Sequence, residues 1–194
     1  MPLPSPSLTP PPFEMQSLTL RSATLQDLDR IMALETAGFA PGHRELRQVY
    51  AQRIMAFPEG SLLACLGPQC IGCVFSEIWR TAPRPDPEHF RLGHDILERH
   101  DPARGTELYI SSMTIDPAFR GLGLGMPLFT GCIDRLATAF PQLTSTLLLV
   151  NANWGRAIGI YRAAGFKEIA RFKEFFRPSG NRCEDGMVMR RPMA

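Results

Sequence analysis

The sequence predicts an α+β fold in which helices flank a mixed, mostly antiparallel β-sheet. Short apolar runs typical of strands alternate with amphipathic segments typical of helices, in the order βααβββαβαββ. One long amphipathic segment joins two buried strands, which indicates a helical crossover between parallel neighbours. The 194 residues have the length of one domain, and a hydrophobic fraction of 44% is enough to form a core.

The N-terminal elements are predicted from local signals. Residues 1–15 are rich in Pro and Ser and have no periodicity, so we expect a disordered tail before a single domain over residues 16–194. A first strand is expected over residues 16–22. Thr24 and Asp27 then have the spacing of a capping box, which predicts the start of the first helix.

The middle of the chain predicts a helix followed by a hairpin. The second helix is expected over about residues 44–55, before a proline. Apolar runs at 61–66 and 71–79 are typical of strands, and a Gly-Pro-Gln turn joins them into a hairpin. Residues 80–104 are polar, with the pattern of a helix around 87–99.

The second half alternates strands and helices. A strand over residues 107–115 precedes the long helix, whose buried stripe is formed by Phe129, Cys132, Ile133, Leu136 and Phe140. Further strands are expected at 146–150, 166–173 and 184–191, with a short helix at 154–164.

The strand over residues 107–115 carries several polar side chains. Successive side chains of a strand point to opposite faces of the sheet. Glu107, Tyr109, Ser111, Met113 and Ile115 are therefore expected to share one face.

Composition argues against several classes of protein. The 21 basic and 19 acidic residues give a net charge of +2 and are mixed along the chain, unlike the basic stripes of nucleic-acid-binding proteins. No apolar run approaches the ~20 residues that span a bilayer, and the N-terminus lacks the pattern of a secretory signal. We expect a soluble, cytoplasmic protein that binds neither nucleic acid nor membrane.

The five cysteines do not predict a metal site or a disulfide framework. Cys70 and Cys73 form one C-x-x-C pair, but there is no second pair to complete a zinc site. The pair also falls in a predicted strand, whereas a redox motif of this kind begins a helix. We expect buried, reduced thiols and no bound metal.

The most informative segment is Ile115-Asp-Pro-Ala-Phe-Arg-Gly-Leu-Gly-Leu-Gly-Met-Pro-Leu. A strand ends, a turn with three glycines follows, and an amphipathic helix begins. Glycines allow the backbone to approach a ligand closely, and the first helical turn presents free N–H groups to an anion. The spacing fits neither the dinucleotide fingerprint nor a P-loop, which leaves a pyrophosphate site or a plain structural turn.

This segment resembles the acetyl-CoA signature of the GNAT superfamily of N-acetyltransferases, R/Q-x-x-G-x-G/A, through Arg120, Gly123 and Gly125. A second stretch, Arg156 to Phe166, is similar to the fourth-helix signature of that family, which ends in Tyr-x-x-x-Gly-Phe. The resemblance spans about residues 17–192. It implies an αβα sandwich of six to seven strands with a splayed parallel pair and about four helices, and transfer of acetyl from acetyl-CoA to an amine.

Within the superfamily, the chain is most similar to arylalkylamine (serotonin-type) N-acetyltransferases. The matching stretches are Pro58–Leu62, Ile71–Trp79 and a loop that leads to Arg104-Gly105. That resemblance implies a small-molecule amine as the acceptor. The two catalytic histidines of those enzymes lie on the central strand, where this chain has Tyr109 and Ser111.

The resemblance also implies roles for individual residues. Backbone groups of Met113, Thr114 and Ile115 would contact the thioester oxygen and the pantetheine arm. The pyrophosphate would be held by the turn and the first helical residues: Arg120, Gly121, Leu122, Gly123, Leu124, Gly125 and Met126. Tyr161 matches the general acid, with a packed core tyrosine as the alternative.

The general base is not given by the resemblance. A water relay past Tyr109 and Ser111 could end at Glu107 or Glu77, and a solvated strand-end charge is the alternative for each carboxylate. His43, His89, His94 and His100 lie outside the central strand and would enter the site only if a loop folded over it. The aromatic residues that flank the acceptor loops are Phe39, Phe57, Trp79 and Phe90.

Two other functions remain open on the sequence. The same fold could acetylate protein N-termini, lysines or an antibiotic-like amine. A protein that only senses acetyl-CoA through a degenerate site is the alternative from another class, although Arg120, Gly123, Gly125 and Tyr161 are all intact.

Overall fold

The computed structural model describes residues 18–178 and 183–193. They form a seven-stranded sheet in the order β1-β2-β3-β4-β5-β7-β6. The strands are β1 (Leu18–Ser22), β2 (Ser61–Leu66), β3 (Gln69–Trp79), β4 (Glu107–Ile115), β5 (Ser145–Asn151), β6 (Lys167–Phe176) and β7 (Glu184–Pro192). The helices are α1 (Leu28–Gly38), α2 (Arg47–Ala56), α3 (Gly125–Ala139) and α4 (Gly155–Ala163). The expected α+β fold and its element order are confirmed. The predicted tail, residues 1–15, lies outside the described residues.

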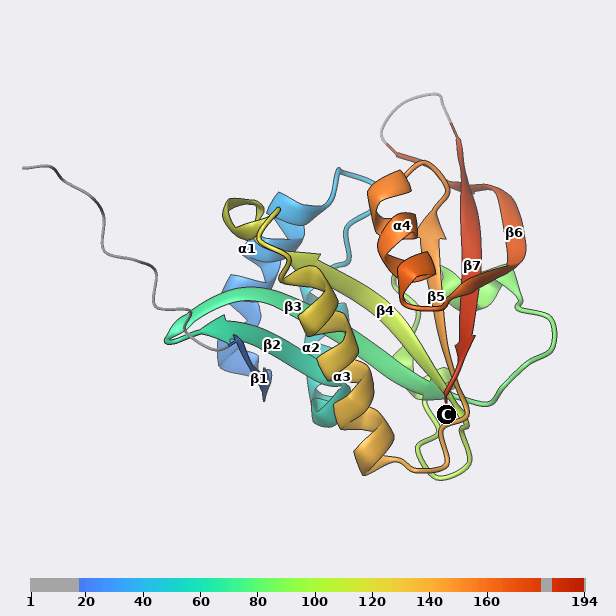
Figure 1. The fold of residues 1–194 in the computed structure, drawn as a ribbon, viewed down its shortest axis with the longest axis horizontal. Helices are drawn as coiled ribbons and strands as arrows, with labels where there is room; N and C mark the ends of the chain where they lie inside the picture. Colours follow the sequence, from blue (N-terminus) through green and yellow to red (C-terminus); the bar gives the residue numbers. More distant parts are fainter. Residues whose placement is uncertain (1–17, 179–182, 194) are drawn as a thin grey trace, which may run out of the picture.

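The helices cover both faces of the sheet, with α3 and α4 on one side and α1 and α2 on the other (Figure 1). The alternation of side chains along the strands explains this arrangement. On β2, Leu62 packs toward α3 and Leu63 toward α1 and α2, and on β3 the neighbours Val74 and Phe75 divide in the same way. Both faces of these strands are therefore apolar, as in a sheet buried between two helical layers.

The expected helix at 87–99 is wrong. The structure has two short 3-10 turns there, Pro87–Phe90 and Ile96–Glu98. Asp86 and Asp95 each cap one turn through the side chain, and Gly93 between them has a φ of +78°. A residue with positive φ ends a right-handed helix, so two separately capped turns replace one continuous helix.

The expected parallel pair is β4 and β5. Their pairing runs from Glu107 opposite Ser145 to Ile110 opposite Leu148. Beyond Ile110, the described part of β4 pairs with β3, while β5 continues against β7 to Asn151. The two strands separate toward their carboxyl ends, which opens the sheet next to the glycine-rich turn.

A β-bulge at Ser111 overturns the expectation that five residues of β4 share a face. Phe75 pairs with Ser112 and Ser76 with Ile110, so Ser111 has no partner on β3. An extra residue in one strand inverts the alternation beyond it. Tyr109 therefore faces the side of α1 and α2, whereas Met113 packs into the core beneath α3, and Ser112 now takes the face of Tyr109.

All five cysteines are free thiols. Cys65, Cys73 and Cys132 are buried and Cys70 is half-buried, but Cys183 is exposed, so the expected burial is wrong at that position. Burial raises the pKa of the Cys132 thiol to about 12, so this thiol stays protonated and unreactive at neutral pH.

Candidate active site

A cleft of about 910 Å³ opens beside the carboxyl end of β4. Its lining residues come from the end of β4, the first turn of α3, the helix α4 and the last residues of α1. Its walls include Gly38, Phe39, Met113, Thr114, Ile115, Phe119, Arg120, Gly121, Gly123, Leu124, Gly125, Met126, Trp154, Arg156 and Tyr161. All the predicted cofactor-binding residues except Leu122, which is exposed beside the others, thus surround one cavity.

The glycine-rich turn has the geometry of an anion site. Gly121 and Gly123 have φ values of +82° and +75°, and a Cβ at either position would meet nothing within 4 Å. The open space lies where a ligand would approach the backbone. Helix α3 begins at Gly125 and leaves the N–H groups of its first turn without intrahelical partners. These groups and the helix dipole fit the pyrophosphate of coenzyme A.

Two arginines add positive charge to this cleft. Arg120 and Arg156 both line it. The Nε of Arg120 donates to the carbonyl of Ile115 at 3.0 Å, which ties the turn to the end of β4. The signature arginine thus supports the shape of the anion site as well as its charge.

Arg30 of α1 holds the segment that leads into the glycine-rich turn. Arg30 donates to the carbonyl of Cys70 and forms an ion pair with Asp116 at 2.6 Å. Asp116 in turn accepts from the amide of Ala118 and caps the short 3-10 turn before the glycines. Asp116 is therefore held from both sides, and its pKa is lowered by the hydrogen bond from Arg30.

The end of helix α1 packs closely against the end of β4 beside the cleft. A Cβ on Gly38 would collide with the side chain of Thr114, so only glycine allows this approach. Phe39, the next residue, lies with its ring centroid 5.8 Å from that of Trp154 at the start of α4. These two rings form an apolar wall of the cleft. The other predicted aromatics lie elsewhere: Phe57 is in the core, and Trp79 and Phe90 pack with Tyr109.

Tyr161 of α4 lines the cleft and packs against Phe129, with 5.2 Å between ring centroids. Burial raises the pKa of its phenol to about 12. The hydroxyl is therefore protonated at neutral pH and can donate a proton or a hydrogen bond into the cleft. The same ring also packs against the hydrophobic core, so its position is compatible with both roles expected from the sequence.

The structure does not bring Tyr109, Ser111 and the cleft together. Tyr109 is stacked on Trp79, with ring centroids 4.0 Å apart, and burial raises the pKa of its phenol well above the usual value. The Oγ of Ser111 is buried and has no hydrogen-bond partner among the described residues. Neither residue lines the cleft.

The two predicted carboxylates already have cationic partners. Glu107 accepts from Arg190 and from the hydroxyl of Ser145, and lines a second cavity, of about 490 Å³, at the opposite end of β4. Glu77 is fully buried and accepts from His94 and from the indole of Trp79, both at 2.8 Å. The hydrogen bond from His94 lowers the pKa of Glu77 despite its burial.

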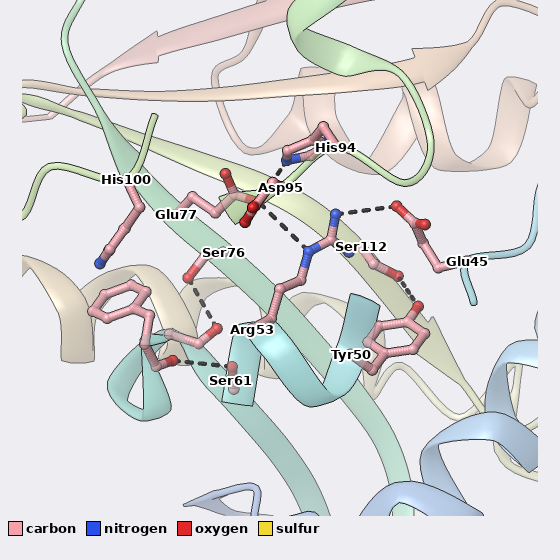
Figure 2. A network of polar contacts seen from close by, with 12 residues as sticks. Glu45, Tyr50, Arg53, Ser61, Ser76, Glu77, His94, Asp95, His100 and Ser112 are labelled. Atoms are coloured by element: carbon pink, nitrogen blue, oxygen red, sulfur yellow. Dashed lines mark hydrogen bonds and ion pairs between the residues drawn. The ribbon is translucent and has the colours of Figure 1, made fainter. Parts of the chain in front are cut away.

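A buried polar network lies between α2 and the sheet, and sequence reasoning missed most of it (Figure 2). Arg53 is 1% exposed and forms ion pairs with Glu45 at 3.0 Å and Glu77 at 3.5 Å. Beside it, the hydroxyl of Tyr50 donates to Glu35 at 2.7 Å and lies 3.3 Å from the Oγ of Ser112. The available signal in the sequence was a charged residue at an apolar position of each predicted helix, Glu35 in the first and Arg53 in the second.

The four histidines have separate environments. His94 does not line the cleft, and its two ring nitrogens contact Glu77 and the carbonyl of Arg91. His100 accepts from the amide of Ile78, and His89 lines the second cavity. His43 lies between Trp154 and Phe176, with its Nε2 3.3 Å from the amide nitrogen of Asn151.

No group of three or more His, Cys, Asp or Glu side chains in the described residues could hold a metal ion. Over the same residues, no helix is both long and apolar enough to cross a membrane.

Known proteins with similar sequence or structure include several N-acetyltransferases. The chain is 29% identical over 119 residues to an uncharacterized N-acetyltransferase of Bacillus subtilis, YkwB. The match covers 58% of this chain and about half, 52%, of that protein. The ribosomal-protein-S18-alanine N-acetyltransferase of Escherichia coli has a similar structure, with a TM-score of 0.66, 19% identity, and coverage of 92% of this chain and 96% of that chain.

The structure of Arabidopsis thaliana Naa50 in complex with the bisubstrate analogue CoA-Ac-MVNAL is also similar. Its TM-score is 0.66, at 20% identity, with 90% of this chain and 98% of that chain covered. These likenesses establish a shared fold. The sequence model of the acetyltransferase (GNAT) family matches residues 27–166, which include both signature motifs and every residue around the cleft named above. The chain belongs to the acetyltransferase (GNAT) family.

Proposed function

We propose that this protein transfers the acetyl group of acetyl-CoA to a primary amine, and that the acceptor is a small aryl- or alkylamine. The observation that carries the proposal is the position of Tyr161 in the same cleft as the glycine-rich turn of α3. An anion site for the coenzyme and a proton donor for its sulfur are thereby combined in one cavity.

The donor half of the reaction is assigned to the turn and to the end of β4. Backbone N–H groups within Gly121 to Met126 bind the pyrophosphate, with Arg120 and Arg156 as nearby positive charges. Pro127 cannot donate, but its fixed φ suits the first turn of a helix. Backbone groups of Met113, Thr114 and Ile115, beside the opening between β4 and β5, are the contacts for the pantetheine arm and the thioester oxygen.

Tyr161 is assigned the role of general acid. Acetyl-CoA supplies an acetyl thioester, whose carbonyl carbon an unprotonated amine can attack. Tyr161 gives its phenolic proton to the sulfur as the carbon–sulfur bond breaks. A phenol with a pKa of about 12 is fully protonated before that step, so it is ready to act.

An apolar or aromatic amine is favoured by the walls of the cleft. Phe39 and Trp154 face the cavity from α1 and α4, and such walls remove water from an incoming amine. The similarity of Pro58–Leu62 and Ile71–Trp79 to arylalkylamine enzymes supports the same acceptor class.

The test is an assay of free coenzyme A released from acetyl-CoA in the presence of tryptamine, phenethylamine, spermidine and short peptides. We expect the two arylalkylamines to give the highest kcat/KM. If only peptides were acetylated, the proposed acceptor class would be wrong, while the proposed acetyltransferase activity would stand. Binding of acetyl-CoA without transfer to any amine would favour a sensor instead.

A further inference from the structure

A base must remove a proton from the acceptor, because an alkylamine with a pKa near ~10.4 is almost entirely an ammonium ion at neutral pH. The carboxylates of Glu77 and Glu107 are each compensated by a cation, and both ring nitrogens of His94 face hydrogen-bond acceptors. The required group must instead connect to the cleft and be able to take up a proton.

Three residues form a continuous hydrogen-bonded chain behind the cleft wall. Ser112 Oγ lies 3.3 Å from Tyr50 Oη, and Tyr50 Oη lies 2.7 Å from Glu35 Oε2 (Figure 2 shows the first of these contacts). The other oxygen of Glu35 accepts from the amide of Glu45 at 2.7 Å. Each hydroxyl can therefore pass a proton toward Glu35 by accepting one and donating its own.

The chain opens to its surroundings at Ser112. Tyr50 is 0% and Glu35 2% exposed, whereas Ser112 is half-buried. Ser112 is not itself one of the cleft-lining residues, but it lies where β4 has just separated from β5, and Thr114, two residues further on the same face, lines the cleft. Gly38 and Phe39, which end the helix that carries Glu35, line it as well.

The bulge in β4 creates this arrangement. Without the extra residue at Ser111, the side chain of Ser112 would point toward α3. With it, Ser112 meets Tyr50 on the side of α1 and α2.

We propose that Ser112, Tyr50 and Glu35 form the proton relay that deprotonates the acceptor amine, with Ser112 as the catalytic residue that contacts it; this inference rests on the proposed acetyltransferase function. One proton passes from the ammonium nitrogen to Ser112 as the hydroxyl proton of Ser112 moves to Tyr50, and the proton of Tyr50 moves to Glu35. The freed electron pair of the nitrogen forms the bond to the acetyl carbon. After attack, a second proton leaves that nitrogen and restores the phenol of Tyr161, which has given its own proton to the sulfur. The proton held by Glu35 is released to water at the end of the cycle.

The surroundings of Glu35 suit a proton acceptor. Burial raises the pKa of its carboxyl group, and the neighbouring carboxylate of Glu45 acts in the same direction. The hydrogen bond from Tyr50 and the charge of Arg53 oppose this shift, and the Cys73 thiol from β3 faces it as a neutral group. The carboxyl group of Glu35 therefore loses its proton at a higher pH than an ordinary glutamate does.

The test compares Ser112→Ala, Tyr50→Phe and Glu35→Gln with the unmodified protein, by kcat across pH with the best amine of the panel. The unmodified protein should lose activity toward acid with an apparent pKa above 4.5. Each variant should lower kcat by about 10²–10⁴-fold and remove that acid limb. Tyr50→Phe should cost little more in a Glu35→Gln background, because the three act as a unit.

Ser76→Ala is the matched control. Ser76 is a buried serine of the neighbouring strand β3, and its hydroxyl donates to the carbonyl of Gly60 at 3.0 Å, outside the relay. It should retain kcat and the pH profile, and all variants should keep the acetyl-CoA Kd, which reports an intact fold. Retention of the acid limb in Ser112→Ala and Glu35→Gln would overturn the relay, as would its loss in His43→Gln alone. If the unmodified protein acetylated no amine, the proposed function would fail instead.

Discussion

Glu107 at the start of β4 is bound on both oxygens by Arg190 of β7, at 2.6 Å from Nε and 3.1 Å from Nη2. Because β5 lies between β4 and β7, this contact passes across β5. It lies at the end of the sheet where β4 and β5 are still paired. The carboxylate is 1% exposed and its charge is compensated. This pairing gives Glu107 a structural function, at the opposite end of β4 from the cleft.

Glu107→Gln should therefore reduce stability and leave the pH dependence of catalysis unchanged. Loss of a charged hydrogen-bond acceptor beside Arg190 should lower the free energy of unfolding by about 1–3 kcal/mol. Chemical denaturation measures the first effect and kcat across pH the second. Glu98→Gln, at an exposed position, is the control and should change neither. Loss of the acid limb in Glu107→Gln would restore this residue as the base.

Gly123→Val should abolish binding of acetyl-CoA. The residue has a φ of +75°, which a β-branched side chain adopts only with strain, and its open side faces the cleft. Isothermal titration with acetyl-CoA is the measurement. Gly159→Val, at an exposed position of α4 with no neighbour within 4 Å, should bind like the unmodified protein. If both variants bound acetyl-CoA with equal affinity, the turn would not be part of the coenzyme site.

Tyr161→Phe should lower kcat by about 10²–10⁴-fold with little change in the Kd of acetyl-CoA. The lost hydroxyl acts on a charge that develops only as the sulfur leaves, while the ring keeps its packing against Phe129. Steady-state kinetics and titration separate the two effects. Unaltered turnover would leave Tyr161 with its packing role alone.

His94→Gln should destabilise the protein in a pH-dependent way. The hydrogen bond to Glu77 raises the pKa of His94 above 6.5 against the opposing effect of burial, and the pKa of Glu77 is lowered below 4.5. The pair therefore contributes its full stability between about pH 4.5 and 6.5, and the contribution declines as pH rises through the folded-state pKa of His94.

The measurement is the difference in free energy of unfolding between the unmodified protein and His94→Gln across pH. It should be about 1–3 kcal/mol near pH 6 and shrink toward pH 9. His89→Gln is the control, since burial lowers the pKa of His89 and its effect has the opposite pH dependence. A difference that is constant from pH 6 to 9 would contradict a charged His94.

Local sequence signals predict the order of the elements, the crossover through α3 and the conformation of the glycine-rich turn. The alternating apolar runs, the capping pair Thr24 and Asp27, and the glycines before α3 each act over a few neighbouring residues, so their consequences are local. A turn that leads into a helix N-terminus offers the same N–H groups in any fold, and Gly121 and Gly123 have the positive φ values that such a turn needs.

The contacts between polar side chains depend on tertiary packing. One extra residue at Ser111 inverts the alternation of side chains along β4 beyond it. Hydrogen-bonded partners also lie far apart in sequence, with 83 residues between Glu107 and Arg190 and 15 between Glu35 and Tyr50, so no local pattern predicts them. Burial then forced each charged group to find a partner, because an unpaired charge in the core is too costly. Strand register and helix packing therefore determine which of Glu77, Glu107 and Glu35 is placed to accept a proton. No short stretch of sequence contains that information.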